Sequence, residues 1–467
     1  MKKYFFLLMF LFVATFSILA QVKEGYNNPY WTEIVTSQPE GYVVDANGDV
    51  EISSAEGLAW LISVVNGLNG CVADNFEGRK VELMSDVDLS GADWIPIGDI
   101  FSDSTLAFKG LFDGKGHTIR NLFIHDNTYT KHYLGLFGYL FHAEVRGLSL
   151  YKGRVIGGSC CGGIAGWSDN GSLVDNCVVN LKAGADFYLG GVVGHNRNST
   201  VRNCCYINDV LGGWDFYSGG IAGWNEANGQ DAVIENCYYD SKIEASLNTE
   251  YNGGIVGLNE VSDNGGIAMV RNCYAELHGL YKVEGGILGR NLGGVVSYCY
   301  YRDEYDGYDV PVIGSGDENY LDCSVFFCRD NNEVILNEPV SIGGYQTDHL
   351  LEALNLWRSI QNPIIMFNEW CEGENLPLFC DQFIGTEERV AQLSEITLFP
   401  NPTTEIVRIK GIAVTEVQVY NILGQLVKTV RNVNEINLST LPEGIYLLRI
   451  MSTNGYLYTE KVTKYKD

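Results

Sequence analysis

The sequence predicts an all-β protein, in which a right-handed parallel β-helix solenoid with helical end caps is followed by a small Ig-like β-sandwich. Three observations support this prediction. A glycine-rich unit recurs about every 30 residues, a second unit ending in cysteine follows each copy, and the composition changes after about residue 390. We expect five segments: a signal peptide (1–20), an N-terminal capping region (21–100), the repeats (101–335), a cap and linker (336–390) and a C-terminal domain (391–467).

The composition limits the classes of function. The 467 residues include 31 Lys+Arg and 58 Asp+Glu, so the formal net charge is −27. A surface this acidic repels phosphate backbones and anionic lipids, which argues against nucleic acid as a partner. Fifty-four glycines beside only 10 prolines indicate repeated tight turns, and 46% hydrophobic residues allow a large core.

The N-terminus is typical of a secretory signal. Lys2 and Lys3 precede an unbroken apolar run, 4–19, and Ala20 provides a cleavage site before Gln21. The run is short for a bilayer span of about 20 residues. We therefore expect export and no membrane span after cleavage, with a short membrane anchor as the less favoured alternative.

The repeat is a Gly-Gly-apolar-apolar-Gly unit, whose second glycine is Gly163, Gly191, Gly220, Gly254 or Gly286, with a degenerate copy at Gly135. The steps between copies are 28, 28, 29, 34 and 32 residues. Insertions fall between the two units and leave the units intact, so the units read as short strands and the gaps as loops. Stacked coils about 4.8 Å apart would pair every strand with its copies.

Stacking predicts columns of identical side chains along the solenoid. Asn196, Asn225, Asn259 and Asn291, with Ser168 in register, would form one amide ladder; Asn176, Asn203, Asn236 and Asn272 would form a second in left-handed turns. Cys177, Cys204, Cys237, Cys273 and Cys299 would form an interior thiol stack, with disulfides between rungs as the alternative. Outside the repeats, Cys323–Cys328 and Cys371–Cys380 are candidate disulfides.

Both ends of the solenoid have a predicted helical lid, because open strand edges need cover. Ser53 and Glu56 form a predicted capping box before the apolar face Leu58, Leu61, Ile62 and Val65. After Thr347, a second helix presents Leu350, Leu351, Leu354 and Trp357.

The C-terminal segment differs in charge. Residues 21–390 contain 21 Lys+Arg and 51 Asp+Glu, whereas residues 391–467 contain 8 Lys+Arg and 7 Asp+Glu. The second range also contains no cysteine. Short alternating strands separated by turn residues predict a small β-sandwich.

This segment resembles the C-terminal sorting domain of the type IX (Por) secretion system of the Bacteroidota. The resemblance rests on Phe399-Pro400-Asn401-Pro402, on 419–425 with Tyr420, Asn421, Gly424 and Gln425, on 441–446 with Gly444 and Tyr446, and on Lys461-Val462-Thr463-Lys464. It implies that the type IX machinery is a partner and that the protein is released, or attached to the outer cell surface, after crossing the outer membrane.

The repeats resemble the GLUG family of bacterial surface proteins. The lead-in segments 94–98 and 108–119 match as well, so the resemblance covers about residues 85–300. It implies an architecture and no particular activity, because the repeat accompanies different effector domains.

No constellation in the sequence predicts catalysis. Asp169, Asp186, Asp215, Glu226 and Asp240 share no recurring offset that would force a carboxylate pair together, and neither a His-Glu-x-x-His nor a Gly-x-Ser-x-Gly motif occurs. We predict no catalytic residue, no metal ligand and no cofactor. Ca²⁺ held by acidic loops and a polysaccharide lyase or glycoside hydrolase on the β-helix stay as open alternatives.

Aromatic residues give the candidate binding site. Trp167 and Trp224 share one offset after their Gly-Gly units, with His195 at that offset in the coil between, and Trp214, Phe216 and Tyr217 cluster nearby. Exposed rings of this kind would stack on sugars, whereas the competing interpretation is that they pack the corners of the coil. We predict an adhesin-like protein that binds a glycan or a host surface protein.

Overall fold

The computed structural model describes residues 28–99, 105–126, 128–245, 251–278, 284–303, 310–328, 334–361, 367–373, 376–380, 397–410, 414–421, 426–431, 434–452 and 457–465. The predicted signal peptide and the segment 381–396 lie outside these residues. The chain divides into two units, 1–367 and 368–467, each described by itself. Strands make up 55% and helices 8%, which confirms the all-β prediction.

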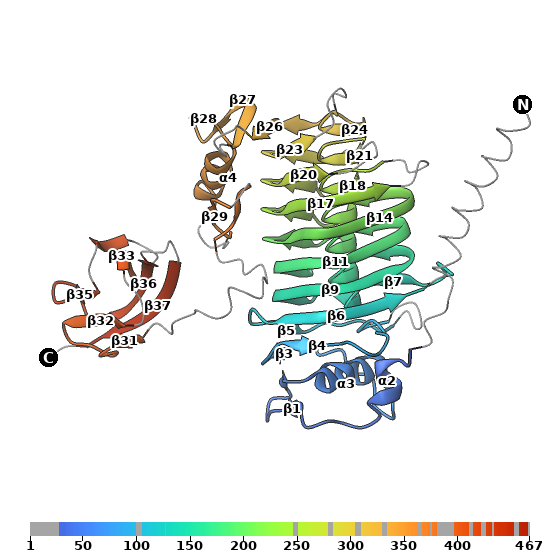
Figure 1. The fold of residues 1–467 in the computed structure, drawn as a ribbon, viewed down its shortest axis with the longest axis horizontal. Helices are drawn as coiled ribbons and strands as arrows, with labels where there is room; N and C mark the ends of the chain where they lie inside the picture. The colour runs from blue at the N-terminus through green and yellow to red at the C-terminus, as the bar shows by residue number, and fades with distance from the viewer. Residues whose placement is uncertain are drawn as a thin grey trace, which may run out of the picture. The chain divides into compact units, whose positions relative to one another are not determined.

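The first unit is a parallel β-solenoid of about eight turns (Figure 1). One sheet has seven parallel strands, one from each successive coil: β8 (Phe137–Phe141), β10 (Ala165–Asp169), β12 (Val193–Arg197), β15 (Ala222–Ala227), β18 (Val256–Val261), β21 (Leu288–Leu292) and β24 (Ile313–Gly316).

The remaining strands of the solenoid belong to one large sheet that bends around the coil. They are β1 (Tyr42–Val44), β2 (Val50–Ile52), β3 (Lys80–Leu83), β4 (Val87–Asp88), β5 (Leu111–Asp113), β6 (Thr118–His125), β7 (His132–Leu134), β9 (Glu144–Cys161), β11 (Leu173–Gly190), β13 (Thr200–Arg202), β14 (Cys205–Gly219), β16 (Ala232–Glu235), β17 (Tyr238–Ala245), β19 (Ala268–Arg271), β20 (Tyr274–His278), β22 (Val295–Ser297), β23 (Tyr300–Asp303), β25 (Tyr320–Leu321), β26 (Ser324–Cys328), β27 (Val334–Ile342) and β28 (Tyr345–His349).

The first amide ladder runs inside the seven-stranded sheet. Asn196 Nδ2 donates to Asn225 Oδ1 (2.8 Å), Asn225 to Asn259 (2.8 Å) and Asn259 to Asn291 (2.9 Å), and all four side chains are fully buried. Ser168 is in register with Asn196. The ladder therefore satisfies the inner buried amides by repetition along the rod, whereas Asn196 Oδ1 and the Ser168 hydroxyl at its end have no hydrogen-bond partner among the described residues.

The second ladder follows a left-handed corner. Asn203, Asn236 and Asn272 have φ between 49° and 53°, a region that asparagine tolerates better than most residues. Asn272 Nδ2 donates to Asn236 (2.7 Å) and Asn236 Nδ2 to Asn203 (2.8 Å). Asn203 in turn donates to Asp175 (2.7 Å), the residue before Asn176.

The five repeat cysteines are free and fully buried. Each thiol lies within 3.0–3.4 Å of the carbonyl oxygen two residues before it. Burial raises the pKa of the Cys177 and Cys204 thiols well above the ordinary value. The five thiols therefore form a buried column in the interior, without disulfides between rungs.

The expected Cys323–Cys328 disulfide is wrong, because Cys323 is a free thiol. Cys323 belongs to the repeat: Asp322 before it has φ 51°, and its thiol lies 3.5 Å from the Leu321 carbonyl, as at the other rungs. Here, at the sixth rung, the repeat motif has degenerated to Leu-Asp-Cys. The side chain of Cys328 lies outside the described part of the structure.

Thiol reactivity tests this column. Of the ten free cysteines among the described residues, eight are buried and only Cys71 and Cys323 are half-buried. We expect a thiol reagent to modify about two groups quickly in the native protein and at least ten after unfolding in guanidinium, because burial blocks access of the reagent to the other thiols. Fewer than ten in the unfolded, unreduced protein would point to disulfides between rungs.

Helix α3 (Ala55–Asn66) covers the start of the solenoid, and the four predicted apolar residues are buried in the core (Figure 1). The capping box at Ser53 is wrong by one residue. Ser54 is the N-cap, and its Oγ accepts from the Gly57 amide (3.1 Å), whereas the Ser53 amide donates to Gly41. The short helix α2 (Trp31–Ile34) precedes it.

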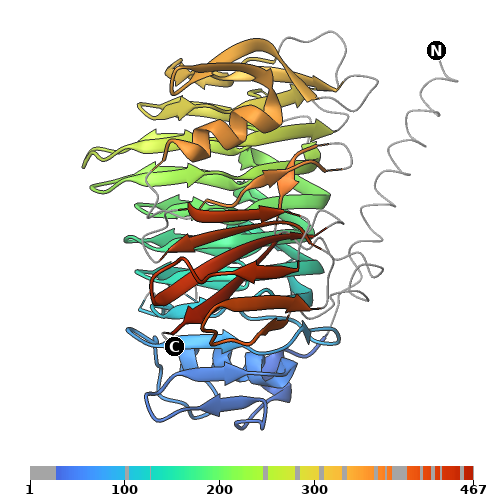
Figure 2. The ribbon, with the colours of Figure 1, turned by 90° about the vertical axis from the view of Figure 1, so that its left-hand side faces the viewer.

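The second predicted lid is misplaced. Helix α4 (Leu350–Ser359) buries Leu354 and Trp357, but its partners are Asn272, whose Nδ2 donates to the Leu354 carbonyl (3.3 Å), and Arg271, whose guanidinium lies 5.5 Å from the Trp357 ring. Both partners lie two coils before the last one. The antiparallel strands β26, β27 and β28 turn the chain back, so α4 lies along the flank of the solenoid (Figure 2).

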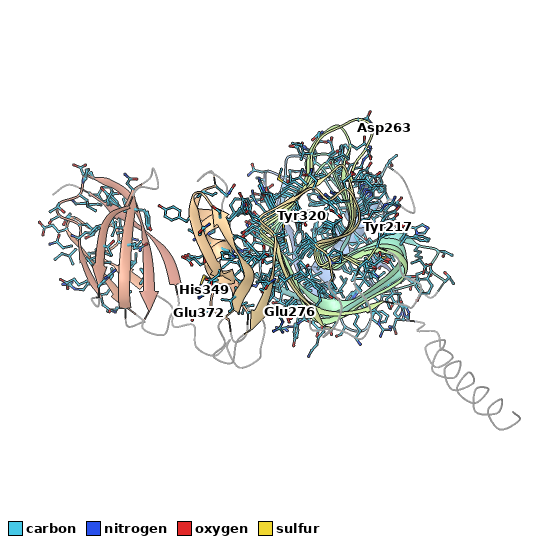
Figure 3. All side chains as sticks on the ribbon, turned by 90° about the horizontal axis from the view of Figure 1, so that it is seen from above. Tyr217, Asp263, Glu276, Tyr320, His349 and Glu372 are labelled. Carbon is cyan, nitrogen blue, oxygen red and sulfur yellow. A yellow bond between two sulfur atoms is a disulfide. The ribbon has the colours of Figure 1, made fainter. Side chains whose placement is uncertain are left out.

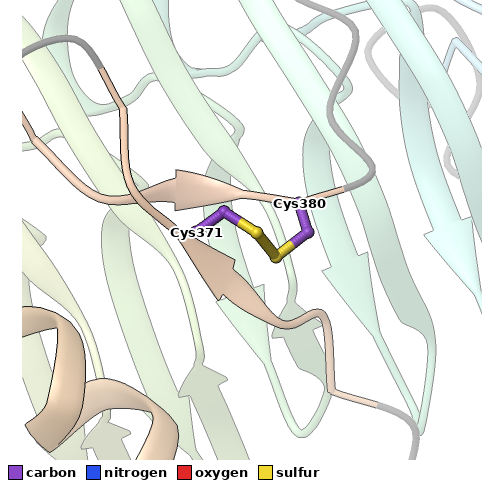
Figure 4. The surroundings of a disulfide bond; sticks show 2 residues. All are labelled: Cys371 and Cys380. Atoms are coloured by element: carbon purple, nitrogen blue, oxygen red, sulfur yellow. A yellow bond between two sulfur atoms is a disulfide. The ribbon is translucent and has the colours of Figure 1, made fainter. Parts of the chain in front are cut away.

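The second unit holds a small disulfide-linked hairpin and a two-sheet domain. Cys371 in β29 (Trp370–Cys371) and Cys380 after β30 (Leu378–Phe379) form the predicted disulfide (Figure 4). The domain has a three-stranded and a four-stranded antiparallel sheet around one apolar core. Its strands are β31 (Thr397–Phe399), β32 (Ile406–Lys410), β33 (Val414–Asn421), β34 (Leu426–Arg431), β35 (Glu435–Asn437), β36 (Gly444–Ser452) and β37 (Leu457–Lys464).

Candidate functional site

The outward side of the seven-stranded sheet carries a column of stacked rings. Trp167, His195 and Trp224 occupy one register position on β10, β12 and β15. The His195 ring lies 5.4 Å from Trp167 and 4.2 Å from Trp224, with interplanar angles of 5° and 3°. Tyr139 on β8 continues the column at 4.9 Å from Trp167.

A second row of rings lies at the neighbouring corner of the coil. Tyr133, Tyr188, Tyr217 and Tyr251 have φ between 52° and 65°, as does Cys160 in the same row. Tyr217 stacks on Tyr188 at 5.3 Å and on Tyr251 at 5.1 Å. The rows interlock, because Tyr133 stacks on Trp167 at 5.4 Å and Tyr188 on Trp224 at 4.8 Å.

We call these eight residues the aromatic face: Tyr133, Tyr139, Trp167, Tyr188, His195, Tyr217, Trp224 and Tyr251. Seven of them are half-buried, and His195 is 5% exposed. Seen along the solenoid, Tyr217 lies on the side away from Glu276 and His349 (Figure 3). His349 directly precedes α4, so α4 begins on the opposite side from Tyr217. The face is therefore separate from the flank that α4 covers.

A charged row borders the rings. Arg197 lies between Asp169 (Nη1 to Oδ2, 3.5 Å) and Glu226 (Nε to Oε2, 3.4 Å), and Glu226 also contacts His195 Nε2 (2.9 Å) and the Ser262 hydroxyl (2.8 Å). Both carboxylates are only 6% exposed. The arrangement is a buried, hydrogen-bonded network beneath the ring edges.

The environment sets the protonation states of this network. Burial lowers the pKa of His195 in spite of the neighbouring Glu226, so the imidazole is neutral at neutral pH and donates from Nε2 to the carboxylate. For Glu226, burial opposes ionisation, but hydrogen bonds from His195 and Ser262 outweigh burial and lower the pKa to about 2. Burial raises the pKa of Asp169.

Acid should expose the contribution of Glu226 to stability. Its pKa lies below the ordinary value, so the stabilisation is present above about pH 4.5 and is lost as the pH falls toward 2; it amounts to at most about 3 kcal/mol. We expect the difference in unfolding free energy between the wild type and Glu226→Gln to shrink over that range. A difference that is constant from pH 6 to pH 3 would contradict this assignment.

Glu260 on β18 stands directly in register with Glu226. It is half-buried, and burial and the charge of Glu226 raise its pKa. The Trp224 side chain and the charge of Arg290 in the next coil oppose this rise in the Glu260 pKa but do not cancel it. The Arg290 guanidinium also lies 5.0 Å from the Tyr251 ring and donates to the Tyr217 hydroxyl (3.3 Å). Two carboxylates therefore adjoin each other on the aromatic face.

The structure brings together three of the five predicted binding residues, Trp167, Tyr217 and Trp224. The side chains of Trp214 and Phe216 lie outside the described part of the structure, although the Phe216 backbone pairs with Phe187. The expectation that the acidic residues share no offset is wrong for two of them. Asp169 and Glu226 each stand six residues after the second glycine of their unit and lie in one row with Arg197, whereas Asp186 and Asp240 lie in the large sheet.

Sequence reasoning missed Tyr188 and Tyr251. The signal was present, because each tyrosine stands two residues before its Gly-Gly pair, as Tyr217 does. It also missed a charge ladder on the large sheet. The residues before the asparagines of the second unit alternate in sign, and they form ion pairs in the structure: Arg202–Asp175 (2.9 Å) and Arg271–Glu235 (2.6 Å).

Neither a metal cluster nor a membrane span is found among the described residues. No group of three or more His, Cys, Asp or Glu side chains is arranged there to hold a metal ion. Over the same residues, every helix is too short or too polar to cross a bilayer.

Comparison with known families identifies the C-terminal domain. Residues 397–464 match the family described as a secretion system C-terminal sorting domain. This protein is type IX cargo. It is therefore secreted to the cell surface or the extracellular space, and the type IX machinery is its partner. No curated protein and no solved structure matches the chain.

The described parts of the predicted sorting motifs meet at one end of the four-stranded sheet, where Asn421 pairs with Tyr446 and Ile445 pairs with Thr463. Pro400, Asn401 and Pro402 follow β31, and the Asn401 side chain accepts from the Thr463 amide of β37 (3.0 Å). Asn421 pairs with Tyr446, whose hydroxyl donates to the Pro442 carbonyl (2.7 Å). Tyr420 lies in β33 and Gly444 begins β36, whereas Gly424 and Gln425 lie outside the described residues.

Proposed function

We propose that the exported solenoid is an adhesin-like protein that binds its ligand on the aromatic face and carries out no chemistry there. The observation that carries the proposal is the gathering of seven half-buried Tyr and Trp rings on one side of a regular rod. Tyrosine and tryptophan are enriched where proteins bind partners, because they offer large contact areas at a low cost in conformational entropy.

The competing proposal is a polysaccharide lyase or glycoside hydrolase. Asp169 and Glu226 share the face, but both are paired with Arg197, and the low pKa of Glu226 suits a permanent ion-pair partner better than a general acid. This supports binding over catalysis. We also propose, from the sequence resemblance, that the coils are GLUG repeats.

The aromatic face is tested by screening the purified chain from residue 21 onward against a glycan array and a panel of extracellular host proteins. Tyr217→Ala and Trp224→Ala should each weaken binding at least tenfold, as central aromatic contacts do. Tyr345→Ala is the control, because Tyr345 is 68% exposed and lies on β28, outside the face.

Thermal unfolding of each variant separates loss of binding from loss of fold, and Tyr217→Phe keeps the ring stack if the alanine variant fails to fold. Binding that is insensitive to both face variants would refute the proposal. New reducing ends or unsaturated products from a polysaccharide panel would favour the enzyme instead.

A further inference from the structure

We infer that the ligand of the aromatic face is a basic, extended polypeptide segment, which places a lysine or arginine side chain against Glu260 and lies with its backbone along the ring edges. This inference rests on the proposed function and specifies the class of ligand.

The first argument is the orientation of the rings. Both faces of Trp167, His195 and Tyr217 are covered by neighbouring rings at 4.2–5.4 Å. A sugar stacks on a free ring face, which these residues do not offer. The exposed edges of aromatic rings carry partial positive charge, so they suit the carbonyl oxygens of a peptide backbone.

The second argument is an unbalanced pair of charges. Glu226 and Glu260 are directly opposite each other on β15 and β18, and like charges at such positions destabilise a sheet. Arg197 is shared between Glu226 and Asp169, and Arg290, which contacts Tyr217 and Tyr251, offsets the charge of Glu260 only in part, because the pKa of the Glu260 carboxyl stays above its ordinary value. A cation supplied by a ligand would therefore compensate the charge of Glu260.

The third argument is the electrostatic field produced by the net charge of residues 21–390. Residues 21–390 contain 51 Asp+Glu against 21 Lys+Arg. A field of this sign accelerates the encounter with cationic segments and disfavours anionic ones. The local charge at Glu260 and the net charge of residues 21–390 thus select the same sign of ligand.

The test uses three fluorescent peptides of equal length, alternating lysine–serine, glutamine–serine and glutamate–serine, at about 0.15 M salt. We expect the lysine peptide alone to bind. Glu260→Gln should weaken it about tenfold, the size of one charge-assisted contact. Glu51→Gln is the matched control, because it removes the same charge from an exposed position on β2, at the start of the solenoid, and should change affinity less than twofold.

Each other outcome overturns the inference in a recognisable way. Equal loss in both glutamate variants would mean diffuse attraction to an acidic surface. Failure of the lysine peptide to bind, together with glycan or neutral-protein binding that depends on Tyr217 and Trp224, would refute the basic ligand and leave the proposed function standing. If a probe binds equally well to the wild type and to the Tyr217 and Trp224 variants, both the basic ligand and the proposed function are refuted.

Discussion

Replacing Gly220 by alanine is expected to lower the free energy of unfolding by about 3 kcal/mol. Gly220 begins the turn of the coil between β14 and β15, where its amide donates to the Gly254 carbonyl of the next coil (3.1 Å). An added Cβ would overlap the Tyr239 ring and that same carbonyl. Because the obstruction is partly backbone, the coils would have to move apart, and the loss should appear in chemical denaturation as a lower midpoint.

Gly70→Ala is the matched control for this prediction. Gly70 has φ 81°, and a Cβ added there would have no other atom within 4 Å, so alanine meets only the left-handed backbone penalty of about 1 kcal/mol. The expected order is a large loss for Gly220→Ala and a small one for Gly70→Ala. The reverse order would mean that coil packing is not what the paired glycines serve.

Asn225→Ala is expected to lower the free energy of unfolding by about 3 kcal/mol. Asn225 accepts from Asn196 and donates to Asn259, both at 2.8 Å, and it also donates to the Ala232 carbonyl (3.2 Å). Alanine would leave buried polar groups on both neighbouring rungs without this partner, at roughly 1–3 kcal/mol for each unsatisfied group. Thermal and urea denaturation would both report the loss.

Asn264→Ala tests whether the loss comes from burial. The Asn264 side chain also donates to an asparagine of the adjacent coil, Asn228 Oδ1 (2.6 Å), but this bond is exposed to water. We expect a change of less than about 0.5 kcal/mol, since water replaces the lost partner. Losses of equal size at Asn225 and Asn264 would argue against the buried ladder as a main source of stability.

The repeat was readable because its period forces equivalent residues onto one line. Asn225, the thiol of Cys204 and the rings of Trp167 and Trp224 lie where superposition of the Gly-Gly units places them. The tyrosines of the corner follow the same period. They were missed because they stand before each glycine pair, whereas the predicted columns used only the positions after it.

Two predictions failed in parts of the chain where the repeat pattern is degenerate or absent: the rung at Cys323 and the position of helix α4. The sixth rung was hidden because Val310-Pro311 stand where the preceding coil has its Gly-Gly pair, so no repeat unit announces Cys323, although Asp322 keeps the same left-handed turn (φ 51°). Helix α4 was correctly recognised as amphipathic, but its apolar face does not specify which surface it covers. That choice depends on β27 and β28, whose antiparallel pairing leads the chain back toward Asn272.

By itself, the sequence determined the solenoid, its amide and thiol columns and the export domain, because each rests on residue types at fixed spacing. Only the tertiary structure decided that the rings of the aromatic face stack on one another. Ring orientation depends on the left-handed corner that aims Tyr188 and Tyr217 at Trp224 and Tyr251. The position of Glu226 opposite Glu260 follows from the period, because each follows a ladder asparagine, Asn225 or Asn259. Only the packing between coils placed the Arg290 guanidinium against Tyr217 and Tyr251.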